Sequence, residues 1–389
     1  MSTTTTGGQK APPPPKRLAL FFDGTWNAAD SDGNETNVTR LARAVRANSG
    51  DRPQIALYLR GVGTTGITLQ KVIEGAFGDG VDENIRAGFM FLSQNYVPGD
   101  EIFLFGFSRG AFTARSLAGF IGRCGLLKRD RLGLVNEAWA YYRSNAAGRS
   151  PSAFSASHGG TAATTVNHAA SIRFVGVWDT VGALGVPRNF LNRGTAAEFQ
   201  FHDTSPSPVI EIGRHALAID EKRDEFVPTL WTVPEGPKQK LGDIQQVWFA
   251  GVHSDVGGGY RNHALADIPL RWMADEAQKA GLDLDFESNL LPGPTATLPA
   301  TAPQHDSRQG WSMKDRLTPT IRAIMGTSPS LGLTEWLYFP INDKGKRLAT
   351  LNESLHPSVL ARRGKRVQEL GGDDDTDAAT ITYRPVNLP

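Results

Sequence analysis

The chain has 389 residues, of which 40% are hydrophobic and 21% charged, and its formal net charge at pH 7 is +1. This composition is typical of a globular protein and gives no electrostatic reason to expect nucleic-acid binding. Cys124 is the single cysteine, which excludes an intramolecular disulfide and a cysteine-based zinc site. Because we find neither a signal peptide nor a run of about 18 apolar residues, we expect a protein that folds in a cytoplasm and has no transmembrane segment.

The first segment, residues 1–16, combines Thr and Gly with four consecutive prolines. Such a composition cannot bury enough apolar surface to offset the entropy of ordering, so we expect a disordered tail. From residue 17 onward, short apolar runs alternate with longer amphipathic stretches. The apolar runs, each typical of a buried strand, are residues 18–22, 55–59, 101–107, 172–178 and 245–252.

The stretches between these runs favour helices. They include "NVTRLARAVRA" at 37–47 and "DENIRAGFMFLSQNYV" at 82–97, where Asp82 is placed to cap the helix. Strands that alternate with helices predict an α/β fold, with a mostly parallel sheet covered by helices on both faces. We expect residues 17–389 to form a single domain.

Two stretches interrupt this alternation. Residues 144–170 are polar and rich in small residues, and we expect a flexible insertion that does not pack and serves as a lid. Residues 285–312 are crowded with Pro and Thr, and we expect an excursion that connects the sheet to a C-terminal helical segment.

Polar residues follow the apolar runs at the points where the strands are expected to end. They are Asp23, Arg60, Ser108, Asp179 and His253. Because the carboxyl ends of parallel strands meet at one edge of a sheet, these residues can share one crevice although they lie far apart in the sequence.

The stretch "EIFLFGFSRGAF" places Ser108 between an apolar run and a helix-favouring segment. A nucleophile elbow needs small residues two positions before and after the serine, and Gly106 and Gly110 provide them. The alternative is a serine that only caps the helix. The strand, turn and helix context favours a nucleophile.

A serine nucleophile needs a general base, and the base needs an acid that orients it. In hydrolases with this elbow the acid and then the histidine follow the serine in the sequence. His253 is the best-placed base because it ends "QQVWFAGV" and precedes "SDVGGGY". Asp179, at the end of "IRFVGVW", is the preferred acid. The other histidines and acids that remain open are His202, His215, His263, His305, His356, Asp203, Asp220 and Asp255.

An oxyanion hole normally takes one N–H from the residue after the nucleophile and one from a loop after a neighbouring strand. Arg109 provides the first, and Gly24 or Thr25 in "FFDGTWN" provides the second, with Asp23 bracing that loop. A cation such as Arg109 in the first turn of a helix opposes the helix dipole, so we expect it to pair with Asp23 or with an anionic part of the substrate. The candidates for substrate binding are Asp23, Arg60, Phe107 and Asp255.

The chain resembles a bacterial and fungal family of uncharacterised α/β hydrolases whose best-known members are type VI secretion phospholipase effectors. The resemblance spans residues 17–389 and rests on "LALFFDGTWN", "GFSRGAFTAR", "VGVWDTVGALG", "ALAIDEKRDEFVPTLW", "QVWFAGVHSDVGGGY", "LADIPLRWM", "LHPSVLARR" and "YRPVNLP". By this resemblance the triad falls on Ser108, Asp179 and His253. The resemblance implies an α/β-hydrolase that cleaves lipid or phospholipid esters, needs no metal or organic cofactor, contacts a membrane peripherally, and has an immunity or secretion-carrier protein as partner. For an effector, it implies export by a route that needs no signal peptide.

Two other functions remain open. The first is a metal-dependent phosphodiesterase with Asp23, His253 and Asp255 as ligands. The second is a non-catalytic binding module that keeps the hydrolase fold. An aspartate-nucleophile phosphatase is disfavoured, because Phe21 stands where its attacking carboxylate would be.

Overall fold

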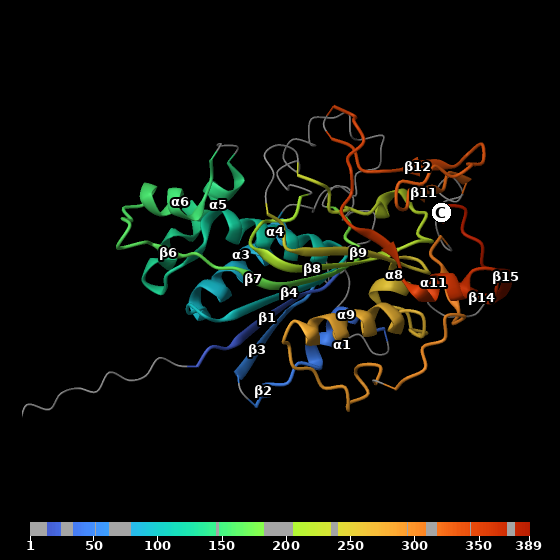
Figure 1. The fold of residues 1–389 in the computed structure, drawn as a ribbon, viewed down its shortest axis with the longest axis horizontal. Helices are drawn as coiled ribbons and strands as arrows, with labels where there is room; N and C mark the ends of the chain where they lie inside the picture. The colour runs from blue at the N-terminus through green and yellow to red at the C-terminus, as the bar shows by residue number, and fades with distance from the viewer. Residues whose placement is uncertain are drawn as a thin grey trace, which may run out of the picture.

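The computed structural model has an α/β fold with a β-sheet at the centre of the molecule (Figure 1). The residues that it describes are 14–24, 34–50, 52–61, 79–144, 148–182, 205–234, 240–293, 295–308, 317–342, 344–371 and 378–389. Thr25, His202 and Asp203 lie outside these ranges, as do residues 1–13 of the expected tail. Lys16, at the end of that tail, donates its backbone N–H to Asp100 at 2.9 Å, so order begins before residue 17.

The central sheet has eight strands, seven of which run parallel. Their spatial order is β13 (Glu353–Leu355), β9 (Asp243–Phe249), β8 (Ile210–Ala218), β7 (Ile172–Trp178), β4 (Glu101–Phe107), β1 (Arg17–Phe22), β3 (Arg52–Leu59) and the antiparallel β2 (Asn48–Ser49). The predicted parallel sheet and its five predicted strands are confirmed. Strand β8 was not predicted, because Glu211, Arg214 and His215 interrupt its apolar residues.

Strand β1 shows how the sheet builds a core on each face. Leu18, Leu20 and Phe22 point into one apolar cluster, and Ala19 and Phe21 point into the other, as the period of two in a strand requires. The first face is covered by α3 (Asp79–Asn95), α4 (Arg109–Cys124), α5 (Val135–Arg143) and α6 (Pro151–Ser157), and the second by α1 (Asn37–Arg43), α8 (His253–Gly257) and α9 (Asp267–Lys279) (Figure 1).

Helix α3 begins earlier than expected. It starts at Asp79, so Asp82 lies within its first turn, where its carboxylate accepts a hydrogen bond from Arg143 at 2.9 Å. The prediction that Asp82 caps this helix is therefore wrong. The boundary was missed because Gly80, a poor helix former, lies in the turn before Asp82.

The expectation that residues 144–170 do not pack is wrong for residues 148–170. Helix α6 is capped by the Ser150 hydroxyl, and Phe154 and Val166 are buried in the core. Strand β6 (Asn167–His168) pairs with β5 (Leu126–Leu127), directly after the C-terminal end of α4. Two apolar anchors and one good cap outweigh the polar composition. Because α4 has 16 residues, the β5–β6 pair after its C-terminal end lies about 24 Å from the helix end next to Ser108, so this part of the segment is not a lid over that serine.

The C-terminal part packs against the carboxyl ends of β8 and β9. A third apolar cluster joins Leu217 and Trp248 of these strands to Ile324, Val359 and Tyr383. Its elements are β10 (Gln304–Asp306), β11 (Thr320–Arg322), β12 (Trp336–Tyr338), α11 (Pro357–Arg362), β14 (Arg366–Gly371) and β15 (Ala379–Thr382). The described residues after 316 contain short strands and the six-residue helix α11, joined by irregular segments, so the expected C-terminal helical segment is not found among them.

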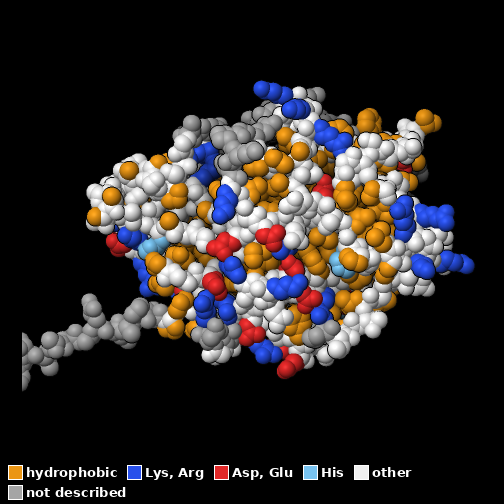
Figure 2. Space-filling model, in the orientation of Figure 1, with side chains coloured by type: hydrophobic (Ala, Val, Ile, Leu, Met, Phe, Trp, Pro, Cys, Tyr) orange, Lys and Arg blue, Asp and Glu red, His pale blue; other side chains and the backbone are white. Residues whose placement is uncertain are grey.

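The surface mixes charges of both signs. Figure 2 shows Lys and Arg side chains interspersed with Asp and Glu over the lower centre of one face, in agreement with the net charge of +1. Among the helices of the described ranges, none combines the length and the apolar character that crossing a membrane requires.

Candidate active site

Ser108 occupies a sharp turn between β4 and α4. Its φ of 56° and ψ of −122° lie outside the regions that non-glycine residues normally adopt, and its side chain does not cap the helix. A Cβ at position 106 would lie 2.3 Å from the carbonyl oxygen of Gly110, and a Cβ at position 110 would lie 2.0 Å from that of Phe22. The requirement for both glycines is confirmed. A strained serine that caps nothing is an arrangement that functional sites use.

Asp179 lies beside this turn because β4 and β7 are neighbours in the sheet. The backbone N–H of Ser108 donates to the carbonyl of Trp178 at 3.1 Å, and Asp179 follows with a φ of 35°. Its fully buried Oδ1 accepts the N–H of Ala218 at 3.0 Å. The strand ends thus bring the predicted nucleophile and the predicted acid together.

His253 completes the group from the first turn of α8, directly after β9. Its Nδ1 lies 2.6 Å from Oδ2 of Asp179, and its ring packs on Phe107 and Phe226 with centroid distances of 4.5 and 4.8 Å. Burial lowers the pKa of His253, although Asp179 opposes this shift. The imidazole is therefore held neutral by its surroundings, which is the state that a general base needs.

The Ser108 hydroxyl and the His253 ring are not hydrogen-bonded to each other among the described residues. Their neighbours are in contact, since the ring of Phe107, the residue before Ser108, lies against the imidazole. Catalytic hydrogen bonds are often long before substrate binds and shorten in the complex. The arrangement can pass a proton from the serine to the imidazole once this contact closes.

Two charged residues that the sequence did not indicate surround the pair. Arg322 on β11 donates from Nη1 and Nη2 to the two oxygens of Asp179 at 2.7 and 3.0 Å. Glu221, which follows β8, accepts the backbone N–H of His253 at 3.2 Å and binds Arg223 through both carboxylate oxygens. Arg322 stands 143 residues from Asp179 in the sequence, and no motif links them.

These partners determine the charge of the two buried carboxylates. Burial alone would raise the pKa of Asp179, but the charge of Arg322 and the hydrogen bond from His253 outweigh it and lower the pKa well below its usual value. Burial is likewise outweighed at Glu221, where Arg223 lowers the pKa to about 2. Both carboxylates are therefore ionised throughout the neutral range.

Asp23 is a structural brace. One carboxylate oxygen accepts the N–H of Gly24 at 2.7 Å, and the other accepts the hydroxyls of Thr36, Thr39 and Tyr58 at 2.7 to 2.8 Å. Burial raises the pKa of Asp23, and these hydrogen bonds oppose the shift. Because the Gly24 N–H already donates to Asp23, it is engaged in this state rather than open to an oxyanion. Thr25, the alternative donor, lies outside the described residues.

Arg109 does not contact Asp23 within the described part of the chain, so the expected pairing of these two residues is not found. Burial lowers the pKa of the Arg109 guanidinium to about 10, so it stays charged at neutral pH. Arg60 is exposed at the end of β3. Phe107 is buried against His253, a position that supports the imidazole.

Asp255 points away from His253. Its Oδ1 lies 2.6 Å from Nδ1 of His305, and its Oδ2 accepts the backbone N–H groups of His305 and Val252. Since Asp23 and Asp255 have separate sets of partners, the three ligands of the metal-dependent alternative do not converge. No cluster of three or more His, Cys, Asp or Glu side chains that could hold a metal ion occurs within the described ranges.

Two of the remaining candidates for base and acid have other partners. His215 accepts the N–H of Thr180 and contacts Gln246, and burial lowers its pKa to about 3. Asp220 accepts hydrogen bonds from Tyr383 and from the N–H of Gly251, and burial raises its pKa to about 6.

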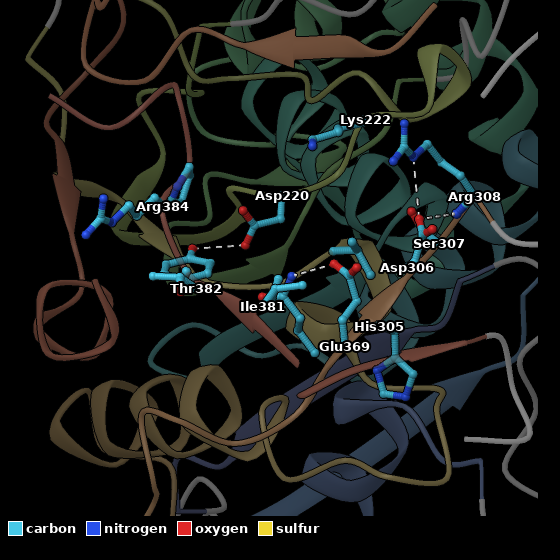
Figure 3. A pocket seen from close by; sticks show the side chains of 14 residues that line it. Asp220, Lys222, His305, Asp306, Ser307, Arg308, Glu369, Ile381, Thr382 and Arg384 are labelled. Atoms are coloured by element: carbon cyan, nitrogen blue, oxygen red, sulfur yellow. Dashed lines mark hydrogen bonds and ion pairs between the residues drawn. The ribbon is translucent and has the colours of Figure 1, made fainter. Parts of the chain in front are cut away.

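Asp220 also lines a cavity of about 160 Å³, together with Lys222, Val252, Gln304, His305, Asp306, Ser307, Arg308, Glu369, Ile381, Thr382, Tyr383, Arg384 and Pro385 (Figure 3). Ser108 does not line this cavity. Val252, the residue before His253, lines the cavity, but the turn that carries Ser108 does not.

Comparisons with known proteins give one family and one curated relative. Residues 16–276 match the family described as T6SS, Phospholipase effector Tle1-like, catalytic domain. The uncharacterized protein YEL023C of Saccharomyces cerevisiae is 31% identical over 245 residues, which cover 57% of this chain and 34% of that protein. The chain therefore spans about a third of the length of this relative.

Two solved structures are also similar. One is an uncharacterized protein from Pseudomonas aeruginosa, with 20% identity, a TM-score of 0.38, and coverage of 69% of this chain and 46% of that chain. The other is the Tle1 effector bound to the VgrG spike from the type VI secretion system, with 19% identity, a TM-score of 0.35, and coverage of 66% and 56%.

Proposed function

Because the chain belongs to the family of type VI secretion phospholipase effectors with a Tle1-like catalytic domain, we propose that it is a serine hydrolase of lipid or phospholipid esters. Ser108 is the nucleophile, His253 the general base and Asp179 the residue that orients the imidazole. The observation that carries this proposal is the buried contact of 2.6 Å between Asp179 and His253, formed beside a strained serine turn.

The proposed reaction has two steps. The Ser108 hydroxyl attacks the ester carbonyl while its proton passes to Nε2 of His253, and the imidazolium returns that proton to the leaving alcohol. Water then attacks the acyl-enzyme and gives one proton to His253, and the imidazolium returns that proton to the Ser108 oxygen as the fatty acid leaves. The backbone N–H of Arg109, the first residue of α4, is the proposed donor to the oxyanion.

The family description names a type VI secretion phospholipase effector, which supports a lipid substrate and a secretion-carrier protein as partner. We include both in the proposal, with synthesis in the cytoplasm and export by a route that needs no signal peptide. Co-purification of the tagged protein from a producing cell, with identification of the bound chains by mass spectrometry, tests the partner.

The experiment that tests the chemistry uses a fluorophosphonate probe and a panel of lipid esters. We expect the probe to label Ser108 and the wild type to hydrolyse at least one ester, with both signals lost in Ser108→Ala. Ser116→Ala is the matched control, because Ser116 is a second buried serine on α4. It should keep both signals.

The outcomes separate the alternatives. Activity that EDTA abolishes while the probe leaves Ser108 unlabelled would establish a metal-dependent reaction and refute the serine mechanism. A wild type that binds lipid vesicles without hydrolysis, and binds equally well as Ser108→Ala, would establish a binding module.

A further inference from the structure

Arg322 makes four hydrogen bonds with its two terminal nitrogens and is 1% exposed. Two of them hold the carboxylate of Asp179. The other two, at 2.7 and 2.5 Å, go to the carbonyls of Ala218 at the end of β8 and Phe226 at the end of η3 (Asp224–Phe226). The two carbonyls, which belong to β8 and η3, therefore fix the position of the guanidinium independently of its contact with Asp179.

This contact leaves Asp179 a single orientation. Oδ1 accepts from Ala218 and Arg322, and Oδ2 accepts from Arg322 and His253. A planar guanidinium that binds both carboxylate oxygens sets the plane of the carboxylate, which a lysine ammonium cannot do. The direction of the hydrogen bond to His253 therefore depends on Arg322.

Arg322 acts on His253 by a second route. It holds the carbonyl of Phe226, and the ring of Phe226 meets the imidazole edge-on at 4.8 Å. From the opposite side, the ring of Phe107 on β4 lies at 4.5 Å. One side chain thus supports both the acid and one of the two rings that enclose the base.

The charges that face His253 come from three places. Asp179 follows β7, Glu221 and Arg223 follow β8, and Arg322 lies on β11. The two carboxylates and the two guanidinium groups balance. Without Arg322 the imidazole would face a net negative charge, which stabilises its protonated form.

We propose that Arg322 is a positioning residue of the esterase reaction, which fixes Asp179 toward His253 and balances the negative charge around the imidazole. This inference rests on the proposed function. It also assigns a role in the site to β11, which lies beyond the family match that ends at residue 276. The segment after the matched region is therefore part of the active site.

The test compares Arg322→Gln and Arg322→Lys with Arg362→Gln and Arg362→Lys. Arg362 is the matched control because it is equally buried and bonds the carbonyls of Ala300 and Ala302, with no contact to the triad. A water-soluble p-nitrophenyl ester gives kcat, KM and the pH profile, the fluorophosphonate probe gives the rate of labelling of Ser108, and thermal unfolding gives stability.

For Arg322→Gln we expect kcat to fall roughly 10- to 100-fold with KM unchanged, because the acid and the base lose their alignment. The acidic limb of kcat/KM should move up by about 1 pH unit, since the imidazolium is favoured once the guanidinium charge is gone. Arg322→Lys keeps the charge and loses the planar fork, so kcat should fall while the limb stays in place. The Arg362 variants should lose stability without a change in kcat or in the limb.

The proposal is overturned if Arg322→Gln changes only the melting temperature, as the Arg362 variants do. If Arg322→Gln does not fold, Arg322→Lys decides, because a kcat equal to that of Arg362→Lys would remove the positioning role. Failure of the proposed function looks different, since the wild type itself would then neither hydrolyse the ester nor be labelled at Ser108.

Discussion

The molecule contains two buried His–Asp pairs that are nearly identical as pairs. Asp179 and His253 are joined by an Nδ1–Oδ2 contact of 2.6 Å, and Asp255 and His305 by an Nδ1–Oδ1 contact of the same length. All four residues are at most 4% exposed. The chemistry of the pair therefore does not by itself distinguish a reactive site from a structural one.

The surroundings distinguish them. His253 lies beside a serine turn, between Phe107 and Phe226, and its acid is held by Arg322. His305 stacks on Tyr260 with a centroid distance of 3.8 Å, and its acid uses a second oxygen to hold backbone N–H groups. In the proposed function the first pair gains its catalytic role from the serine turn beside it, whereas the second pair ties α8 to β10.

The largest expected contrast comes from the two imidazoles. His253→Ala should lower kcat about 10⁵-fold, because it removes the proposed general base that takes the proton of Ser108. His305→Ala should stay within about tenfold of the wild-type kcat and lose thermal stability, since it leaves the buried Asp255 carboxylate without a charged-group partner. Ester hydrolysis and thermal unfolding measure both. Equal losses of kcat would erase the distinction between the pairs.

The two acids should differ in the same direction. Asp179→Asn should reduce kcat roughly 10⁴-fold, because an amide no longer fixes the tautomer of His253 or stabilises its charged form. Asp255→Asn should mainly destabilise the fold. The measurement is kcat at saturating ester, with circular dichroism to confirm folding. A kcat of Asp179→Asn within tenfold of the wild-type value would contradict the role proposed for Asp179.

The turn at Ser108 lies beside the Asp179–His253 pair and not beside the Asp255–His305 pair. A substitution at Gly110 should distort this turn. Gly110→Ala should destabilise the protein by roughly 1 to 3 kcal/mol, because the new Cβ would lie 2.0 Å from the carbonyl of Phe22. Gly133→Ala is the control, since nothing lies within 4 Å of the Cβ added there. Denaturant unfolding compares the two, and equal stabilities would contradict the tight turn.

The smallest effect is a displaced pH profile. Burial lowers the pKa of His253 from its ordinary value of 6.5, and a base acts only when neutral, so kcat/KM should be constant near pH 7 and fall only below pH 6.5. The stability that the lowered pKa of Asp179 contributes is present above its ordinary value of 3.8 and is lost as the pH falls below it, so the fold persists through this window. A midpoint above 6.5 in the rate of fluorophosphonate labelling would contradict this prediction.

Local sequence pattern was sufficient for the sheet and for the serine turn. Apolar runs located β1, β3, β4, β7 and β9, and the spacing of Gly106 and Gly110 around Ser108 identified a turn whose geometry tolerates no Cβ at either glycine. These features are short-range, because a strand pattern and a tight turn are encoded by residues within a few positions of one another.

Composition misled where a few residues outweighed the average. The polar composition of residues 148–170 predicts a segment that does not pack, but Ser150 caps α6 and Phe154 anchors this helix in the core. The polar residues Glu211, Arg214 and His215 hid β8, whose interior position in the sheet is decided by its neighbours β7 and β9.

The sequence by itself determined five strands of the central sheet, the sharp turn at Ser108, and which residues follow those strands, because each of these depends on neighbouring residues in the chain. Only the tertiary structure decided that Asp179 pairs with His253 while Asp255 turns to His305, and that Arg322 comes from 143 residues away to hold the acid. Those choices depend on which side chains share a buried volume after the sheet has assembled, where every charge must find a partner.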